Sequence, residues 1–133
     1  MKSDELSYWV EQAGSGPDRL AAAFMLGRAR RSRAARAALR DLLRDEDANI
    51  RDFAAQSLAQ IGDRDAVDTI MGLLKTTPPR WATGMAWGLV TLAPHVASRR
   101  DEIRRALIAY HKRARGRSRL HAKALLARLD EET

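Results

Sequence analysis

Of all the residues in this chain, the arginines of residues 28–44 are best suited by their type and spacing to bind a ligand. Four of them, Arg33, Arg36, Arg40 and Arg44, follow one another at intervals of three and four residues. Residues at these intervals share one face of a helix. A guanidinium group stays charged, and its planar fork of donors fits phosphate and carboxylate oxygens. The row therefore predicts a surface that binds an anionic group.

A second basic group lies in residues 99–119. Its candidate partner-binding members are Arg100, Arg104, Arg105, Lys112 and Arg113. The net charge of +7 is unevenly distributed, because residues 28–44 carry +6 and residues 77–133 carry +7, whereas residues 45–76 carry −4. This balance favours anionic partners, but the acidic stretch argues against a continuous phosphate track. A solvated basic surface without a partner explains the composition equally well.

The remaining reactive side chains have simpler explanations. His95, His111 and His121 lack the spacing of metal ligands, and the carboxylates of residues 45–47 and 101–102 precede or begin predicted helices, where capping explains them. The chain has no cysteine, no P-loop and no nucleophile elbow. The sequence predicts no metal, no cofactor and no catalytic residue.

The elements that position these side chains are short amphipathic helices. The first helix of the stretch Asp47–Lys75 has apolar residues at helical spacing, at Ile50, Phe53, Ala54, Leu58 and Ile61. After Gly62-Asp63, a second apolar stripe follows at Ala66, Val67, Ile70, Leu73 and Leu74. Two such helices cannot bury their apolar faces alone, so they imply stacked neighbours.

This stretch resembles a HEAT repeat of the short kind found in phycobilisome-lyase-like proteins. The matching residues are Asp47, Ile50, Arg51, Ala54, Ala55, Leu58, Ile61, Gly62, Asp63, Ala66, Val67, Ile70, Leu73 and Leu74. Aligning the other helices with it gives a column of leucines, Leu26, Leu58, Leu89 and Leu126, spaced by 32, 31 and 37 residues.

We therefore predict an all-α, right-handed α-solenoid of about three HEAT-like helix pairs with capping helices, spanning residues 1–133 as one domain. The N-terminal capping helix covers residues 1–14, the repeats cover residues 17–45, 47–76 and 78–113, and the C-terminal capping helix covers residues 117–130. In the family, the second helices line the concave surface, so the resemblance implies that both basic groups follow one groove. It also implies that Asp47 and Arg51 are structural.

Trp87 is a further candidate for partner contact. It aligns with Gln56, a position that the family normally leaves polar, and Phe24 aligns with the same position. Large apolar side chains at solvent-facing positions indicate contact with another molecule. A neighbouring helix of the same chain could also cover them.

The sequence favours a non-catalytic binding module for a protein partner, in a cytoplasmic monomer or small homo-oligomer without a signal peptide or membrane span. The alternative is sequence-independent binding of a nucleic-acid backbone by the arginines. A third reading is an enzyme resembling HEAT-like DNA glycosylases or bilin lyases. Against the glycosylase, no carboxylate occurs between Asp68 and Asp101.

Overall fold

The computed structural model describes residues 1–131, which form eight α-helices and three short 3₁₀ helices and contain no strand. The α-helices are α1 (Ser3–Ser15), α2 (Arg19–Leu26), α3 (Arg33–Leu42), α4 (Ala48–Gln60), α5 (Val67–Thr76), α6 (Thr83–Leu92), α7 (Arg100–Arg113) and α8 (Arg117–Glu131). The 3₁₀ helices are η1 (Arg64–Ala66), η2 (Pro79–Trp81) and η3 (Ala93–Arg99). The prediction of an all-α fold is confirmed. Within the described residues, no helix is long and apolar enough to cross a membrane.

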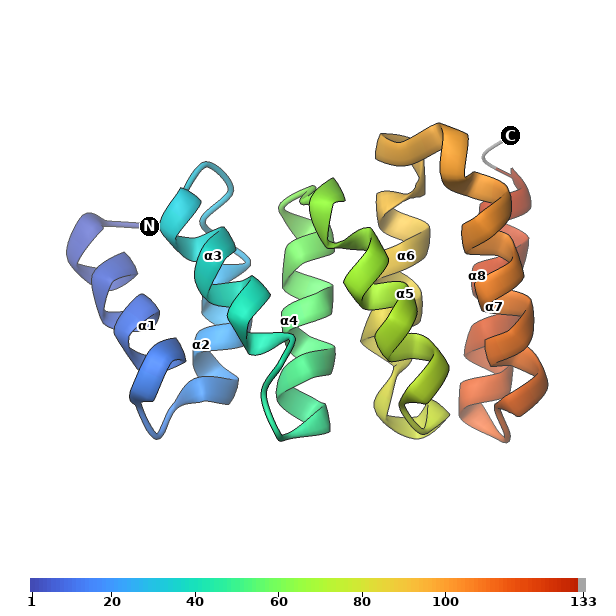
Figure 1. Ribbon diagram of the computed structural model, residues 1–133, viewed down its shortest axis with the longest axis horizontal. Coiled ribbons are helices and arrows are strands. Elements are labelled where there is room, and N and C mark those ends of the chain that lie inside the picture. Colours follow the sequence, from blue (N-terminus) through green and yellow to red (C-terminus); the bar gives the residue numbers. More distant parts are fainter. Residues whose placement is uncertain (132–133) are drawn as a thin grey trace.

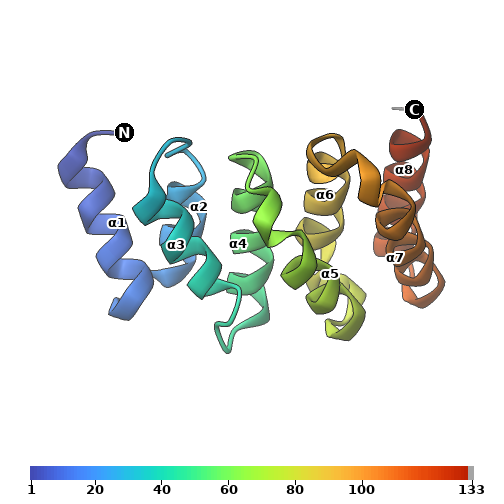
Figure 2. The same cartoon turned by 45° about the horizontal axis from the view of Figure 1, so that its top comes forward.

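The helices form a solenoid of two layers (Figures 1 and 2). In one layer α2, α4, α6 and α8 pack in sequence, each on the next, while α3, α5 and α7 make up the other layer. Helix α1 closes one end by packing on α2 and α3, and α7 and α8 stand together at the opposite end. Each helix therefore contacts only near neighbours, as expected of a repeat protein.

The closest helix contact, between α4 and α6, depends on two glycines. A Cβ atom on Gly84 would lie 2.9 Å from the carbonyl oxygen of Asp52, and one on Gly88 would lie 3.3 Å from the Ala55 carbonyl oxygen. Glycine normally weakens a helix interior. Here it lets the backbones of α4 and α6 approach closely, which tightens the centre of the solenoid.

The core follows the leucine column. Leu26, Leu58 and Leu89 are completely buried, and Ile61 is buried as well, which confirms the predicted register of the repeats. In α8 the buried leucines are Leu125 and Leu129, while the aligned residue Leu126 is only partly buried. The leucine column therefore does not extend into α8, where the buried leucines lie one residue before and three residues after the aligned position.

The turn between α4 and α5 uses Gly62 as predicted. Gly62 has a φ of +75°, a backbone angle that residues with a Cβ rarely adopt. The N–H of Asp63 donates to the Leu58 carbonyl at 2.9 Å. The first repeat has Arg30 where this glycine is expected. There α2 ends earlier, at Leu26, and the chain runs through residues 27–32 before Ser32 Oγ caps α3 by accepting from the Ala35 N–H.

Trp81 is exposed, although aligning Leu89 with Leu58 places it at the position of Ile50, which predicts a core residue. The side chain is 38% exposed, and the guanidinium of Arg80 lies 5.7 Å from its ring. The cause is the Pro78-Pro79 pair, since it places Trp81 in η2 and delays the start of α6 to Thr83. Ala82 and Met85, both fully buried, occupy the core instead.

Candidate interaction surfaces

The predicted basic residues of α3 divide into exposed cations and cations that bind their own chain. Arg33 and Arg44 are exposed and make no ion pair or hydrogen bond with a described side chain. Arg36 donates to the carbonyl of Arg30 at 2.9 Å. Arg40 binds Asp63 through two hydrogen bonds of 2.7 Å, and this contact raises the pKa of Arg40 above its ordinary value.

The Arg40–Asp63 pair links α3 to the turn that precedes α5. The side chain of Asp63 is only 4% exposed, whereas that of Arg40 is 44% exposed. Asp65 adds a longer contact of 3.4 Å to the same guanidinium. A buried carboxylate needs a partner, so part of the positive charge predicted for binding serves the fold.

The basic residues of α7 show the same division. Arg104 pairs with Asp130 at 3.0 Å, and Arg100 donates to the carbonyl of Leu129, so both join α7 to α8. Arg113 donates to the carbonyls of Leu74 and Thr77 at 2.9 and 2.7 Å, which closes the end of α5.

The other two basic candidates of α7, Arg105 and Lys112, are exposed on the surface. Neither makes an ion pair or hydrogen bond with a described residue. They are therefore available to bind another molecule.

A third ion-pair network lies at the start of the second basic group. Arg99, in η3, binds both Asp68 at 2.5 Å and Glu102 at 2.8 Å. These contacts raise the pKa of Arg99 and lower that of Glu102. The acidic stretch of residues 45–76 thus supplies counter-ions to arginines on both sides, which the segment charges do not reveal.

A groove of about 320 Å³ separates α5 from α7. Its floor consists of Met71, Gly72, Ala106 and Ala109, and its rim carries both signs of charge. The rim residues are Asp68, Lys75, Glu102 and Arg105. Only Arg105 of this set stands out in the sequence as a candidate for partner binding, because small residues on two separate helices give no local signal.

Trp87 lies on the opposite layer, away from the basic groups. It is half-buried and lines a shallow pocket of about 220 Å³ with Gln56, Thr83 and His121. The ring of His121 is 3.2 Å from the carbonyl of Thr83. Phe24, in the same layer, is 57% exposed. The structure therefore does not bring Trp87 together with the arginines.

Asp52 stands behind this pocket and caps α6. Its two carboxylate oxygens accept from the N–H groups of Gly84 and Met85 at 3.0 and 2.8 Å. Burial raises the pKa of Asp52 above its ordinary value, although the two hydrogen bonds oppose the shift. Capping accounts for this carboxylate. No group of His, Cys, Asp or Glu within residues 1–131 is arranged to hold a metal ion.

The pattern of helices matches a known protein family. A family model described as HEAT repeats matches residues 3–90, which is more than half of the chain. The chain belongs to the HEAT-repeat family. A comparison with curated proteins returned no match. The phycobilisome-lyase-like subtype stays a prediction.

The HEAT-repeat residues Arg51 and Asp47 hold the turn before α4. Arg51 Nη1 donates to the carbonyls of Asp45 and Glu46 at 2.6 and 3.1 Å, and Asp47 accepts from the N–H of Asn49. Arg19, which aligns with Arg51, instead pairs with Asp45 at 2.7 Å. Arg19, in α2, and Arg51, in α4, thus both bind the loop that precedes α4.

Proposed function

We propose that this HEAT-repeat chain is a non-catalytic scaffold that binds a protein partner through the α5–α7 groove and the exposed cations beside it. The groove carries the proposal, because Gly72, Ala106 and Ala109 are small and leave room for an inserted segment beside Met71. The cations of Lys75 and Arg105, which form no ion pair within residues 1–131, line its rim together with the carboxylates of Asp68 and Glu102, which both bind Arg99. A protein segment can offer groups of both signs to such a rim, and charge complementarity of this kind provides specificity.

Binding of a nucleic-acid backbone is the weaker candidate. A phosphate track requires unpaired positive charge along its length, since each neutralised phosphate releases counter-ions. Along this layer, the guanidinium groups of Arg40, Arg99 and Arg104 are already paired with carboxylates. We expect duplex and single-stranded DNA to bind with micromolar or poorer affinity at physiological salt, as non-specific complexes do. Tight binding that survives raised salt would promote this candidate.

A graded series at Gly72 tests the groove. A Cβ on Gly72 would meet no atom within 4 Å, so Gly72→Trp fills the groove without a clash in the core, and Gly72→Ala adds only a methyl group. The tagged chain and both variants are used to capture proteins from nuclease-treated lysate of the source cells. We expect a protein that binds the unaltered chain and Gly72→Ala but is lost with Gly72→Trp. If the unaltered chain, Gly72→Ala and Gly72→Trp all captured the same protein in equal amounts, a role for the groove would be contradicted.

A further inference from the structure

The two ends of the solenoid have opposite charge. Helix α1, which forms one end, contains Asp4, Glu5 and Glu11 and no basic residue. None of these carboxylates takes part in an ion pair within residues 1–131. At the other end, residues 103–129 contain no carboxylate and carry many cations.

The acidic end presents an aromatic side chain between two carboxylates. Asp4, Tyr8 and Glu11 follow one another at intervals of four and three residues, so they share one face of α1. The opposite face buries Ala13 against the core. Tyr8 is 46% exposed although the edge of its ring packs on Trp9, with the ring centroids 4.9 Å apart. The outward face of α1 is thus a tyrosine flanked by negative charge.

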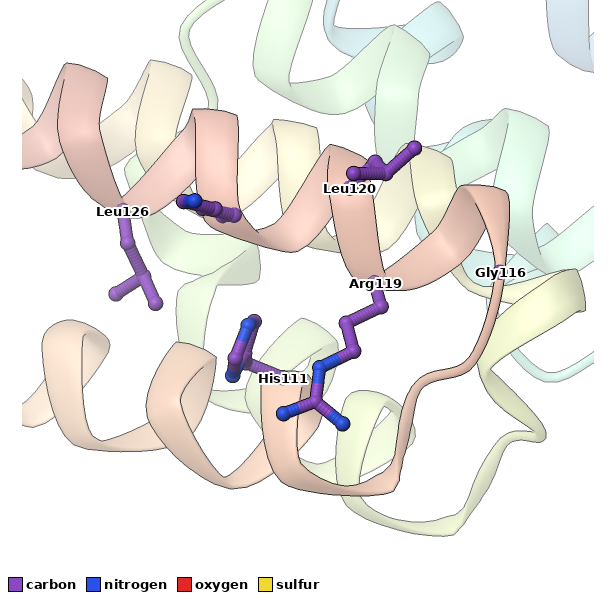
Figure 3. A pocket seen from close by; sticks show the side chains of 6 residues that line it. His111, Gly116, Arg119, Leu120 and Leu126 are labelled. Carbon is purple, nitrogen blue, oxygen red and sulfur yellow. The ribbon is translucent and has the colours of Figure 1, made fainter.

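The basic end contains an amphiphilic cleft between α7 and α8 with a volume of about 510 Å³ (Figure 3). Leu120 and Leu126 supply its apolar lining, and His111, Arg119 and Lys123 supply its polar groups. Arg119 extends from α8 toward α7, and His111 rises from α7 toward α8 (Figure 3).

The cleft opens on the end of the solenoid rather than toward the core. Leu120 is 70% exposed, whereas Ala122, Leu125 and Leu129 of the same helix are buried against the preceding helices. Arg119 and Lys123 form no ion pair within the described part of the chain. An exposed leucine beside unpaired cations is therefore available to a second molecule.

We infer that the occupant is α1 of a second copy of this chain, so that copies associate head to tail. Tyr8 of one copy enters the cleft beside Leu120 and Leu126 of the next, and the flanking carboxylates meet the cations of α8. Asp4 and Glu11 are seven residues apart, about 10 Å along α1. Arg119 and Lys123 are one turn apart, about 6 Å. One turn of α8 thus fits between the two carboxylates.

The energetics fit a weak, salt-sensitive contact. Tyrosine is enriched among the residues that dominate binding energy because it buries a large apolar ring and keeps a polar tip. The surrounding charges attract across a solvated rim, so salt screens them. Since each copy has one acidic and one basic end, the contact is heterologous and can continue to a third copy. This association leaves the α5–α7 groove free and does not depend on its function.

Two complementary variants test the inference by sedimentation velocity in about 50 mM salt. The acidic-end variant carries Asp4→Asn, Tyr8→Ala and Glu11→Gln, so that its altered end has no charge to pair, and the basic-end variant carries Arg119→Glu and Lys123→Glu. We expect the unaltered chain to associate as its concentration rises and each variant alone to associate at least tenfold more weakly. An equimolar mixture should form a 1:1 dimer and stop there, because the mixture retains one intact junction. Arg64→Glu with Arg80→Glu is the control, since it makes the same change of charge in η1 and η2, in the middle of the solenoid.

The outcomes separate this arrangement from other forms of association. An unaltered chain that stays monomeric up to about 1 mM overturns the inference. A symmetric contact between like ends would leave one variant associating as well as the unaltered chain, and this result also overturns it. If both variants are monomeric and their mixture is monomeric too, the two ends do not bind one another. Circular dichroism of each variant checks that the helices are retained.

Discussion

Replacing Arg40 by Ser should destabilise the chain even though Arg40 lies on the surface. Arg40 is the partner of Asp63, whose side chain is 4% exposed and accepts two hydrogen bonds of 2.7 Å from this guanidinium. Removing the cation leaves a buried carboxylate with unmet hydrogen-bonding capacity. Exposed ion pairs generally contribute about 0–1 kcal/mol to the free energy of unfolding. A larger loss of stability would therefore come from leaving the buried carboxylate of Asp63 without its partner.

The structure limits the size of this effect. Hydrogen bonds to charged groups contribute about 1.5–3 kcal/mol each, but Arg40 is 44% exposed and water can enter the space that it leaves. We therefore expect the free energy of unfolding to fall by about 1–3 kcal/mol, less than the roughly 3–5 kcal/mol that breaking a fully buried pair costs. With a urea m-value of about 2 kcal/mol/M, the unfolding midpoint should fall by about 0.5–1.5 M.

Arg33→Ser is the matched control, because Arg33 lies on the same helix, is exposed and has no ion-pair partner within residues 1–131. It should change stability by less than about 0.5 kcal/mol. Equal midpoints for the two variants would refute the reasoning. A double-mutant cycle with Asp63→Asn then measures the coupling, which should be close to the full loss seen for Arg40→Ser.

Three further predictions concern the core and the helix contacts. Leu58→Ala should lower the free energy of unfolding by about 2–5 kcal/mol, because Leu58 is fully buried, and urea denaturation measures it. Gly72→Ala should stabilise the chain by up to about 1 kcal/mol since its Cβ meets no neighbour. Gly84→Ala should destabilise the chain by about 1–3 kcal/mol, because the new Cβ overlaps the α4 backbone. Equal melting temperatures for Gly72→Ala and Gly84→Ala would contradict the expected difference between these two glycines. Burial raises the pKa of Tyr110 to about 12 while its hydroxyl donates to the Pro79 carbonyl. The unfolded chain ionises this phenol first, so stability should fall between about pH 10 and 12, and Tyr110→Phe should weaken that fall.

The repeat architecture could be read from the sequence because it depends on local patterns. The spacing of Leu26, Leu58 and Leu89 and the glycine at position 62 indicate helices, a turn and a register that the structure confirms. The placement of Trp81 failed because a proline pair moved the start of a helix, and propensity at boundaries is weak evidence.

The role of the charged residues could not be read in the same way. The sequence shows that Arg40 shares a helical face with other arginines, but not that Asp63, 23 positions later, faces it. Ion pairs between successive repeats depend on the offset of the stacked helices, which a one-dimensional charge pattern does not contain. The α5–α7 groove could not be predicted from the sequence either, because Gly72 and Ala109 have no distinguishing chemistry of their own.

The close packing of α4 on α6 has a consequence for how the chain opens. Opening from either end breaks one helix contact at a time, as in other linear arrays of repeats. The α4–α6 contact lies between the two ends and is held by the glycines of α6. Slow hydrogen exchange should therefore concentrate in the amides of α4 and α6 and decline toward α1 and α8. A chain with this gradient keeps a structured centre while its terminal helices detach and rejoin.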